Sequence, residues 1–198
     1  MDPQPDNFDL EPLDRTQMLV AIGATAVVLL LVTTLWRQFG KVALLPWHVD
    51  LSSILIGIGV GMGIIAASAI IYQVWPAYRV STDLYLQLVL APLLLPDMVW
   101  VGLLPGLSEE LLFRGVMLPA LGANMTGLIL SSLCFGVLHF SSPRLWAYAI
   151  WATIVGLILG AVALWTDNLM VPIVAHITAN FVSSVAWKLR SANLSAHP

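Results

Sequence analysis

The sequence predicts an all-α fold, a polytopic bundle of about six or seven transmembrane helices. Hydrophobic residues make up 59% of the 198 residues and charged residues only 10%, and the mean hydropathy is +0.91. Soluble domains contain about one half apolar and one quarter charged residues. Runs of about 20 apolar residues, the length that crosses a hydrocarbon core of about 30 Å as a helix, recur along the chain. We therefore expect an integral membrane protein.

Six segments have the length and composition of membrane spans, and a further helix carries the sequence "GLSEELLFRG". The glycines of "GIGVGMG" at 57–63 indicate close packing between helices. We expect the spans at about 16–36, 51–75, 84–104, 125–140, 145–165 and 169–187, and the further helix at about 108–121.

Prolines leave two interpretations of the middle of the chain. Pro92, Pro96 and Pro105 interrupt the region 84–121, and proline breaks or bends a helix. In the first interpretation one span is followed by a separate helix, which gives seven crossings. In the second, a short broken lead-in is followed by one span from about 97 to 121, which gives six crossings.

The distribution of Lys and Arg predicts the orientation, because cytoplasmic loops are enriched in these residues. Both interpretations place the C-terminus and the 141–144 loop in the cytoplasm; only the side of the N-terminus changes. The size of the chain and its lack of a signal peptide favour a bacterial plasma (inner) membrane. With seven crossings, one side of the membrane carries Arg37, Lys41, Arg144, Lys188 and Arg190, and the other side carries Arg15 and Arg79. With six crossings, one side carries Arg15, Arg79, Arg144, Lys188 and Arg190, and the other side carries Arg37 and Lys41.

The sequence divides into four parts, and no part indicates a second, soluble domain. Cys134 is the only cysteine, so neither an intrachain disulfide nor a cysteine metal cluster is possible. A net charge of -3 with eight basic residues gives no indication of nucleic acid binding. We expect a disordered acidic tail at 1–15, leading transmembrane helices at 16–83, a core at 84–188 and a short C-terminal tail at 189–198.

Ionisable residues inside the apolar segments are the main functional signal. One such residue at the bilayer centre costs about 2.5 to 3.5 kcal/mol on insertion scales, and these residues usually face a protein interior or a water-filled cavity. Glu110 and Arg114 are four residues apart and are expected to pair on one helix face. Glu109 is rotated by about 100° from Glu110 and is left without that partner.

Two further helices bring polar residues at the same spacing. Phe135 and His139 in "CFGVLHF" are one turn apart, and so are His176 and Asn180 in "AHITANF". His176 and Asn180 could instead be interhelical hydrogen-bond partners, worth about 0.6 to 2 kcal/mol. That interpretation leaves Glu109 unexplained. One glutamate, two histidines and one asparagine from three helices are therefore expected to converge on one buried pocket.

Several hydrolytic chemistries have no motif in this chain. H-E-x-x-H and G-x-S-x-G are both absent. Ser108 is interpreted as a helix cap beside the acidic first turn. Cys134 lies in an apolar run, where a thiolate is disfavoured. A water molecule activated by a carboxylate remains.

Three motifs in this order resemble those of the CPBP family, the CAAX protease and bacteriocin-processing (Abi) family of intramembrane glutamate proteases, which is related to the type II CAAX prenyl endopeptidases. The motifs are "EELLFRG", "FGVLH" and "HITAN", and the resemblance covers about 85–187. It implies a protease core at 84–188, with the active site buried among the C-terminal helices.

The resemblance also implies a role for each motif residue. Glu109 would be the general base, and His139 would help to hold and polarise the attacking water. His176 and Asn180 would stabilise the oxyanion, with preorganised donors worth about 3 to 4 kcal/mol each. The supporting residues are expected to be Glu110 and Arg114, which would hold the glutamate-bearing helix, and Phe135, which would pack under the site.

The expected partners are a peptide or protein substrate at the membrane and the lipid bilayer itself, and no cofactor is expected to be required. The first alternative is a zinc site formed by Glu109, His139 and His176. The second is a non-catalytic scaffold, an immunity factor or a regulator-binding protein that uses the same fold. The third, a small transporter or proton relay, is less consistent with the order of the three motifs.

Overall fold

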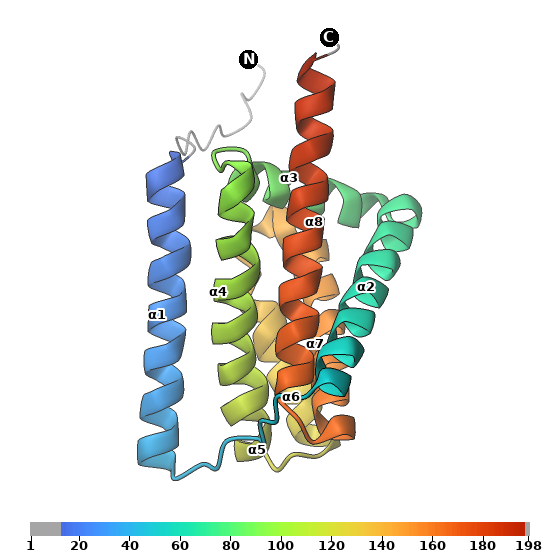
Figure 1. Cartoon of the computed structure of the whole chain (residues 1–198). Coiled ribbons are helices and arrows are strands. Elements are labelled where there is room, and N and C mark those ends of the chain that lie inside the picture. The colour runs from blue at the N-terminus through green and yellow to red at the C-terminus, as the bar shows by residue number, and fades with distance from the viewer. Residues whose placement is uncertain (1–12, 197–198) are drawn as a thin grey trace, which may run out of the picture.

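The computed structural model describes residues 13–196, and the side chains of residues up to 193. The fold is all-α as predicted, with no strand in the described part of the chain. Figure 1 shows the long helices side by side in a bundle, with α3 lying across one end. The elements are α1 (Arg15–Gly40), α2 (Leu51–Val74), α3 (Pro76–Leu90), η1 (Leu95–Asp97), α4 (Met98–Glu110), η2 (Leu111–Met117), α5 (Leu118–Ala120), α6 (Met125–Leu138), η3 (Pro143–Leu145), α7 (Trp146–Thr166) and α8 (Met170–Ala196).

The chain is a multi-pass membrane protein. Among the described residues, four helical segments are long and apolar enough to cross a membrane, and a bent helix pair supplies a fifth candidate. α6 has only 14 residues, or about 21 Å at 1.5 Å per residue, which is shorter than a hydrocarbon core. The four segments are Arg15–Gly40, Leu51–Val74, Pro143–Thr166 and Met170–Asn193.

The predicted span at 84–104 is wrong. The chain turns by 106° between Pro76–Leu90 and Leu95–Ala120. Pro92 lies in the break and Pro96 in the first turn that follows; because proline supplies no backbone N–H, neither residue can continue a hydrogen-bonded helix from α3. The helix expected at 108–121 is the second half of the segment that begins at Leu95. The second interpretation, a broken lead-in followed by one span, describes the structure.

The two ends of the bundle differ in their number of Lys and Arg residues. The start of α1 and the end of α8 lie at the end of the bundle that α3 crosses (Figure 1). This end carries the cations of the start of α1 (Arg15), of α3 (Arg79), of η3 (Arg144, bonded to Ser81 of α3) and of the last part of α8 (Lys188 and Arg190). The opposite end of α1 carries Arg37 and Lys41, as six crossings require.

α8 is the central packing element, in contact with α2 and α4, while α6 packs against α7. A β-carbon on Gly57 would lie 2.7 Å from Val174, and one on Gly61 would lie 2.6 Å from the Ala175 carbonyl oxygen. A β-carbon on Gly59 would meet nothing within 4 Å. The expected close packing at 57–63 is therefore confirmed for the glycines that face α8.

Both predicted tails adjoin or overlap a terminal helix of the bundle. Most of the acidic tail at 1–15 lies outside the described residues. The remainder is ordered, because Asp14 caps α1 by accepting a hydrogen bond from the Gln17 amide at 2.8 Å. At the other end, helix α8 runs to Ala196 and includes most of the tail expected at 189–198. The proposed boundary between 83 and 84 falls inside α3.

Candidate active site

The motif residues lie on three helical segments that pack together. Glu109 and Glu110 end α4, and Arg114 lies in η2, while His139 caps the end of α6 and His176 lies in the second turn of α8. Glu110 and Arg114 are fully buried, Glu109 is 7% exposed and His176 is 6% exposed. These charges are therefore inside the bundle, which is the placement expected for ionisable residues of a membrane span.

The segment after Glu110 is a π-helix, Leu111–Met117. The Leu118 amide donates to the Phe113 carbonyl, five residues back, so this turn is wider than an α-helical turn. The Gly115 carbonyl accepts a hydrogen bond from the Leu45 amide at 3.0 Å, and a β-carbon on Gly115 would lie 2.9 Å from Leu44. Single π turns occur frequently at functional sites. Residue spacing did not predict this turn.

Glu110 is the centre of a buried ionic network. Its Oε1 atom accepts from Arg114 Nη1 at 2.6 Å, which confirms the predicted pair, and lies 2.7 Å from His176 Nδ1. Arg114 Nη2 also donates to the Gly156 carbonyl at 3.0 Å, and the Arg114 guanidinium lies 4.4 Å from the Phe135 ring centroid. The network therefore joins α4, η2, α6, α7 and α8. The contact between His176 and Glu110 was missed, because sequence spacing cannot pair residues of distant helices.

Glu109 and His139 face each other. Glu109 Oε2 lies 3.9 Å from His139 Nε2, and His139 Nδ1 lies 2.8 Å from the Phe135 carbonyl oxygen. A carbonyl oxygen can only accept, so Nδ1 carries the proton and, in the neutral imidazole, Nε2 presents its lone pair to Glu109. The Phe135 ring packs beneath His139, with 4.6 Å between ring centroids, as predicted.

Three polar atoms of this site are buried without a hydrogen-bond partner. They are Glu109 Oε2, Glu110 Oε2 and Arg114 Nε; Thr82 Oγ1 is the fourth such atom among the described side chains. A buried polar atom without a partner costs about 1 to 3 kcal/mol, and in a native structure such an atom requires an explanation. A purely structural network would be expected to satisfy these atoms.

Asn180 is half-buried on α8, one turn beyond His176. Within the described residues its amide makes no hydrogen bond, whereas His176 is held by Glu110. The two side chains therefore share a helix face, as the spacing predicted, but only His176 has a fixed partner.

The alternative zinc ligands are not assembled as one set. No group of three or more His, Cys, Asp or Glu side chains among residues 13–193 is placed to hold a metal ion. His176 Nδ1 is bound to Glu110 and His139 Nδ1 to the Phe135 carbonyl, which leaves only one nitrogen of each ring for any other ligand.

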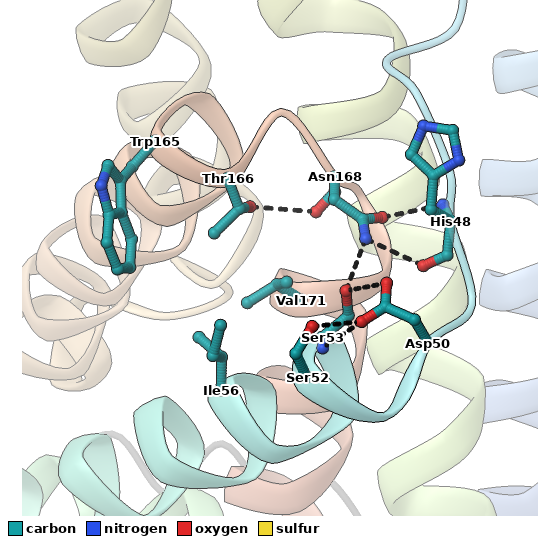
Figure 2. Close-up of a pocket in the computed structure, with 9 residues that line it drawn as sticks. All are labelled: His48, Asp50, Ser52, Ser53, Ile56, Trp165, Thr166, Asn168 and Val171. Atoms are coloured by element: carbon teal, nitrogen blue, oxygen red, sulfur yellow. Dashed lines mark hydrogen bonds between the residues drawn. The ribbon is translucent and has the colours of Figure 1, made fainter.

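A cavity of about 540 Å³ lies at the other end of the bundle, where the α1–α2 linker meets the turn between α7 and α8 (Figure 2). Asn168 is one of its lining residues: Nδ2 donates to the His48 carbonyl at 2.8 Å and to Ser53 Oγ at 2.7 Å, and Oδ1 accepts from the amides of His48 and Met170 at 3.0 Å each. Both hydrogens and both lone pairs of the amide are used. The lining contains neither Glu109 nor either motif histidine. Its polar contacts connect the turn between α7 and α8 to the α1–α2 linker and to the first turn of α2.

Asp50 supports the same region. It caps α2, and hydrogen bonds from Ser52 and Ser53 lower the pKa of Asp50 to about 2. The carboxylate therefore stays ionised and holds the first turn of α2 beside Asn168 (Figure 2).

The fold and the site together define a multi-pass helical membrane protein in which two buried carboxylates lie beside one buried and one half-buried imidazole. Residues 91–182 match the family described as type II CAAX prenyl endopeptidase Rce1-like. All the motif residues from Glu109 to Asn180 lie within the matched region. This match supports a protease of the CAAX type at the level of the family.

The chain is also similar along most of its length to a bacterial protein. It is 27% identical over 183 residues to the uncharacterized protein YpbD of Bacillus subtilis (strain 168), and the alignment covers 92% of each chain. No solved structure matches.

Proposed function

We propose that the chain is an intramembrane glutamate endopeptidase, which hydrolyses a peptide bond of a membrane-associated substrate through a water activated by Glu109 and His139. The observation that carries this proposal is the pair of facing acceptors: Glu109 Oε2, buried without a partner, and His139 Nε2, 3.9 Å away. Two acceptors this close repel each other unless a donor lies between them or one is protonated, and a separation above 3.5 Å suits a bridging water.

The geometry supports general-base catalysis. A water that donates one hydrogen to Glu109 and the other to His139 keeps its lone pairs for the scissile carbonyl carbon. As the C–O bond forms, the water proton passes to Glu109, and the same proton then goes to the nitrogen of the leaving amine when the C–N bond breaks. His139 holds the water and polarises it, because its other nitrogen is fixed by the Phe135 carbonyl.

His176 and Asn180 are proposed to stabilise the oxyanion. The Glu110 carboxylate holds His176 Nδ1 at 2.7 Å, so Nε2 is the ring nitrogen proposed to donate to the oxyanion. Asn180, whose amide has no partner among the described residues, supplies the second donor.

The remaining motif residues are proposed to support the site. Glu110 and Arg114 hold α4 and η2 in register with α7 and α8, and Phe135 packs under both the guanidinium and His139. No cofactor is required in this mechanism, because Glu109 serves as base and the donors serve as electrophiles. A chelator titration of the purified protein, with its metal content measured alongside, should leave activity unchanged; loss of activity with loss of bound zinc would favour the zinc alternative.

We also propose that substrates approach from the cytoplasm or its leaflet, and that the C-terminus is cytoplasmic in a bacterial plasma membrane. His139 lies at the end of α6 that leads to Arg144, the end of the bundle with five of the seven cations considered for orientation. Cys134 is exposed, so cysteine scanning at Ser141 and Arg144 needs a Cys134→Ala background. Labelling of these positions only from outside the cell would contradict this orientation.

A scaffold, an immunity factor or a regulator-binding protein is the second candidate, because the buried Glu110–Arg114–His176 network alone would tie the helices together. Comparison of membrane-fraction peptides from cells with the wild type, Glu109→Ala and the surface control Asp83→Asn separates the two. A protease predicts new termini that vanish only in Glu109→Ala. Identical sets of termini in all three strains would favour the scaffold.

A further inference from the structure

Two tyrosines outside the three motifs form an aromatic stack beside His139. The ring centroids of Tyr148 and His139 are 6.0 Å apart, with 54° between their planes. Tyr148 in turn stacks on Tyr85 at 4.3 Å and 20°. These separations lie within or just below the range of favourable aromatic pairs, about 4.5 to 7 Å. His139 therefore has two aromatic neighbours, Phe135 from its own helix and Tyr148 from α7.

The stack connects the site to the helix that lies across the end of the bundle. Tyr85 belongs to α3, and Tyr148 to the first turn of α7. α3 is fixed to the start of α7 by a hydrogen bond from Ser81 Oγ to the Arg144 carbonyl, at 2.8 Å. Both tyrosines are half-buried. Through the two ring contacts, the pair links His139 to α3.

His139 needs this support because of its place in the chain. α6 ends at Leu138, and the residues from Phe140 to Ser142 form no helix. Within its own helix, the imidazole is held only by Phe135, through the hydrogen bond from Nδ1 to the Phe135 carbonyl and through the Phe135 ring. A ring packed against it from another helix restricts its tilt, and a misplacement of about 1 Å can cost about 100-fold in rate.

We propose that Tyr148 is a positioning residue for His139, held in place by Tyr85 from α3. The catalytic consequence of this inference rests on the proposed function, because a misplaced His139 matters only if it holds the attacking water. The ring is the required feature, since it is the ring of Tyr148 that contacts His139.

Kinetics of the purified protein on a substrate identified from membrane-fraction termini test this role. Tyr148→Leu should lower kcat by about 10- to 100-fold with KM within about twofold, because misplacement acts on the bound complex. Tyr148→Phe keeps the ring and should stay within about twofold of the wild type, and Tyr85→Leu should show a smaller loss of kcat than Tyr148→Leu. Trp165→Leu, an exposed aromatic residue near the opposite end of α7, is the control. Unchanged kcat in Tyr148→Leu, or an increase of KM alone, would overturn the inference.

An NMR measurement tests the same inference without any substrate. The protein has four histidines, and His139→Gln assigns the imidazole signal of residue 139. That signal should be a single sharp resonance in the wild type and Tyr148→Phe, and shifted or broadened in Tyr148→Leu; Tyr148→Met serves if the leucine variant does not fold. An unchanged signal would overturn the positioning role, whereas failure of the proposed function would appear as absent proteolysis in the wild type with the NMR shift intact.

Discussion

The two buried polar regions of this protein differ in how completely their atoms are paired. Asn168, at the cavity of Figure 2, uses every donor and acceptor of its amide. The cluster around Glu110 is buried as deeply, yet Glu109 Oε2, Glu110 Oε2 and Arg114 Nε have no partner. The first region connects a linker to a helix turn, and the second holds unpaired charge in the interior of a membrane bundle.

This difference identifies the functional region better than cavity size does. Stability favours complete pairing, because each unpaired buried atom costs about 1 to 3 kcal/mol. A site that must bind a water and a developing oxyanion keeps polar atoms available for them. The 540 Å³ cavity therefore marks a structural junction, and the facing pair of Glu109 and His139 marks the chemistry.

Breaking the ionic network should have the largest effect on stability. Arg114→Met removes the bonds to Glu110 and to the Gly156 carbonyl, and loss of one partner of a buried pair costs about 3 to 5 kcal/mol. Unfolding of the purified protein should show this loss, while the exposed control Arg79→Met should stay within about 0.5 kcal/mol of the wild type. Equal stability of the two variants would show that Arg114 does not compensate Glu110.

The oxyanion role of Asn180 should give the next largest effect. Because Asn180 makes no hydrogen bond within the described residues, Asn180→Ala should leave stability nearly unchanged. Its kcat should fall by about 100- to 1,000-fold, the loss seen when one oxyanion donor is removed. Steady-state kinetics measure this change; a loss below about threefold would remove Asn180 from the catalytic set.

Asn168 should show the opposite pattern. Asn168→Ala leaves the amides of His48 and Met170, the His48 carbonyl and Ser53 Oγ without their partner, so unfolding should become easier by about 1 to 3 kcal/mol. Activity per folded molecule should match the wild type, as should that of the surface control Gln38→Ala. A fall in kcat with unchanged stability would assign this cavity a part in catalysis.

The smallest effect should be the pH dependence at Asp50. Its pKa of about 2 lies below the ordinary value of 3.8, so ionised Asp50 stabilises the fold above about pH 4, and this contribution is lost as the pH falls through about 2. Melting temperatures of the wild type and Asp50→Asn should differ slightly at pH 6 and converge towards pH 2, because Asn also caps a helix. A difference that grows as the pH falls would have the wrong sign.

The features that depend on composition and on local residue spacing could be predicted from the sequence. Composition predicted the helical membrane fold, and the four-residue spacing predicted the contact between Glu110 and Arg114 and that between Phe135 and His139. The place of the break in the middle of the chain was only one of two interpretations, because Pro92, Pro96 and Pro105 all allow it. The packing of the helices distinguishes the two interpretations, because α3 lies across the end of the bundle and α4 begins after the break.

Tertiary contacts were beyond reach of the sequence. The contact of His176 with Glu110 joins residues 66 positions apart. The Gly115 carbonyl of the π turn accepts a hydrogen bond from the Leu45 amide of another segment. Gly115 was the one local indication of a close approach there. The tyrosine stack carries no motif, because an aromatic residue in an apolar helix is ordinary in a membrane protein.

The most direct measurement of the central claim is the activity and the stability of Glu109→Gln in the same purified preparation. Glu109 Oε2 has no partner to lose, and a neutral amide is cheaper to bury than a carboxylate, so the variant should unfold at the same or a higher temperature than the wild type. Its peptide-bond hydrolysis should fall below detection. Retention of more than about one tenth of the wild-type rate would contradict the claim that Glu109 activates the attacking water.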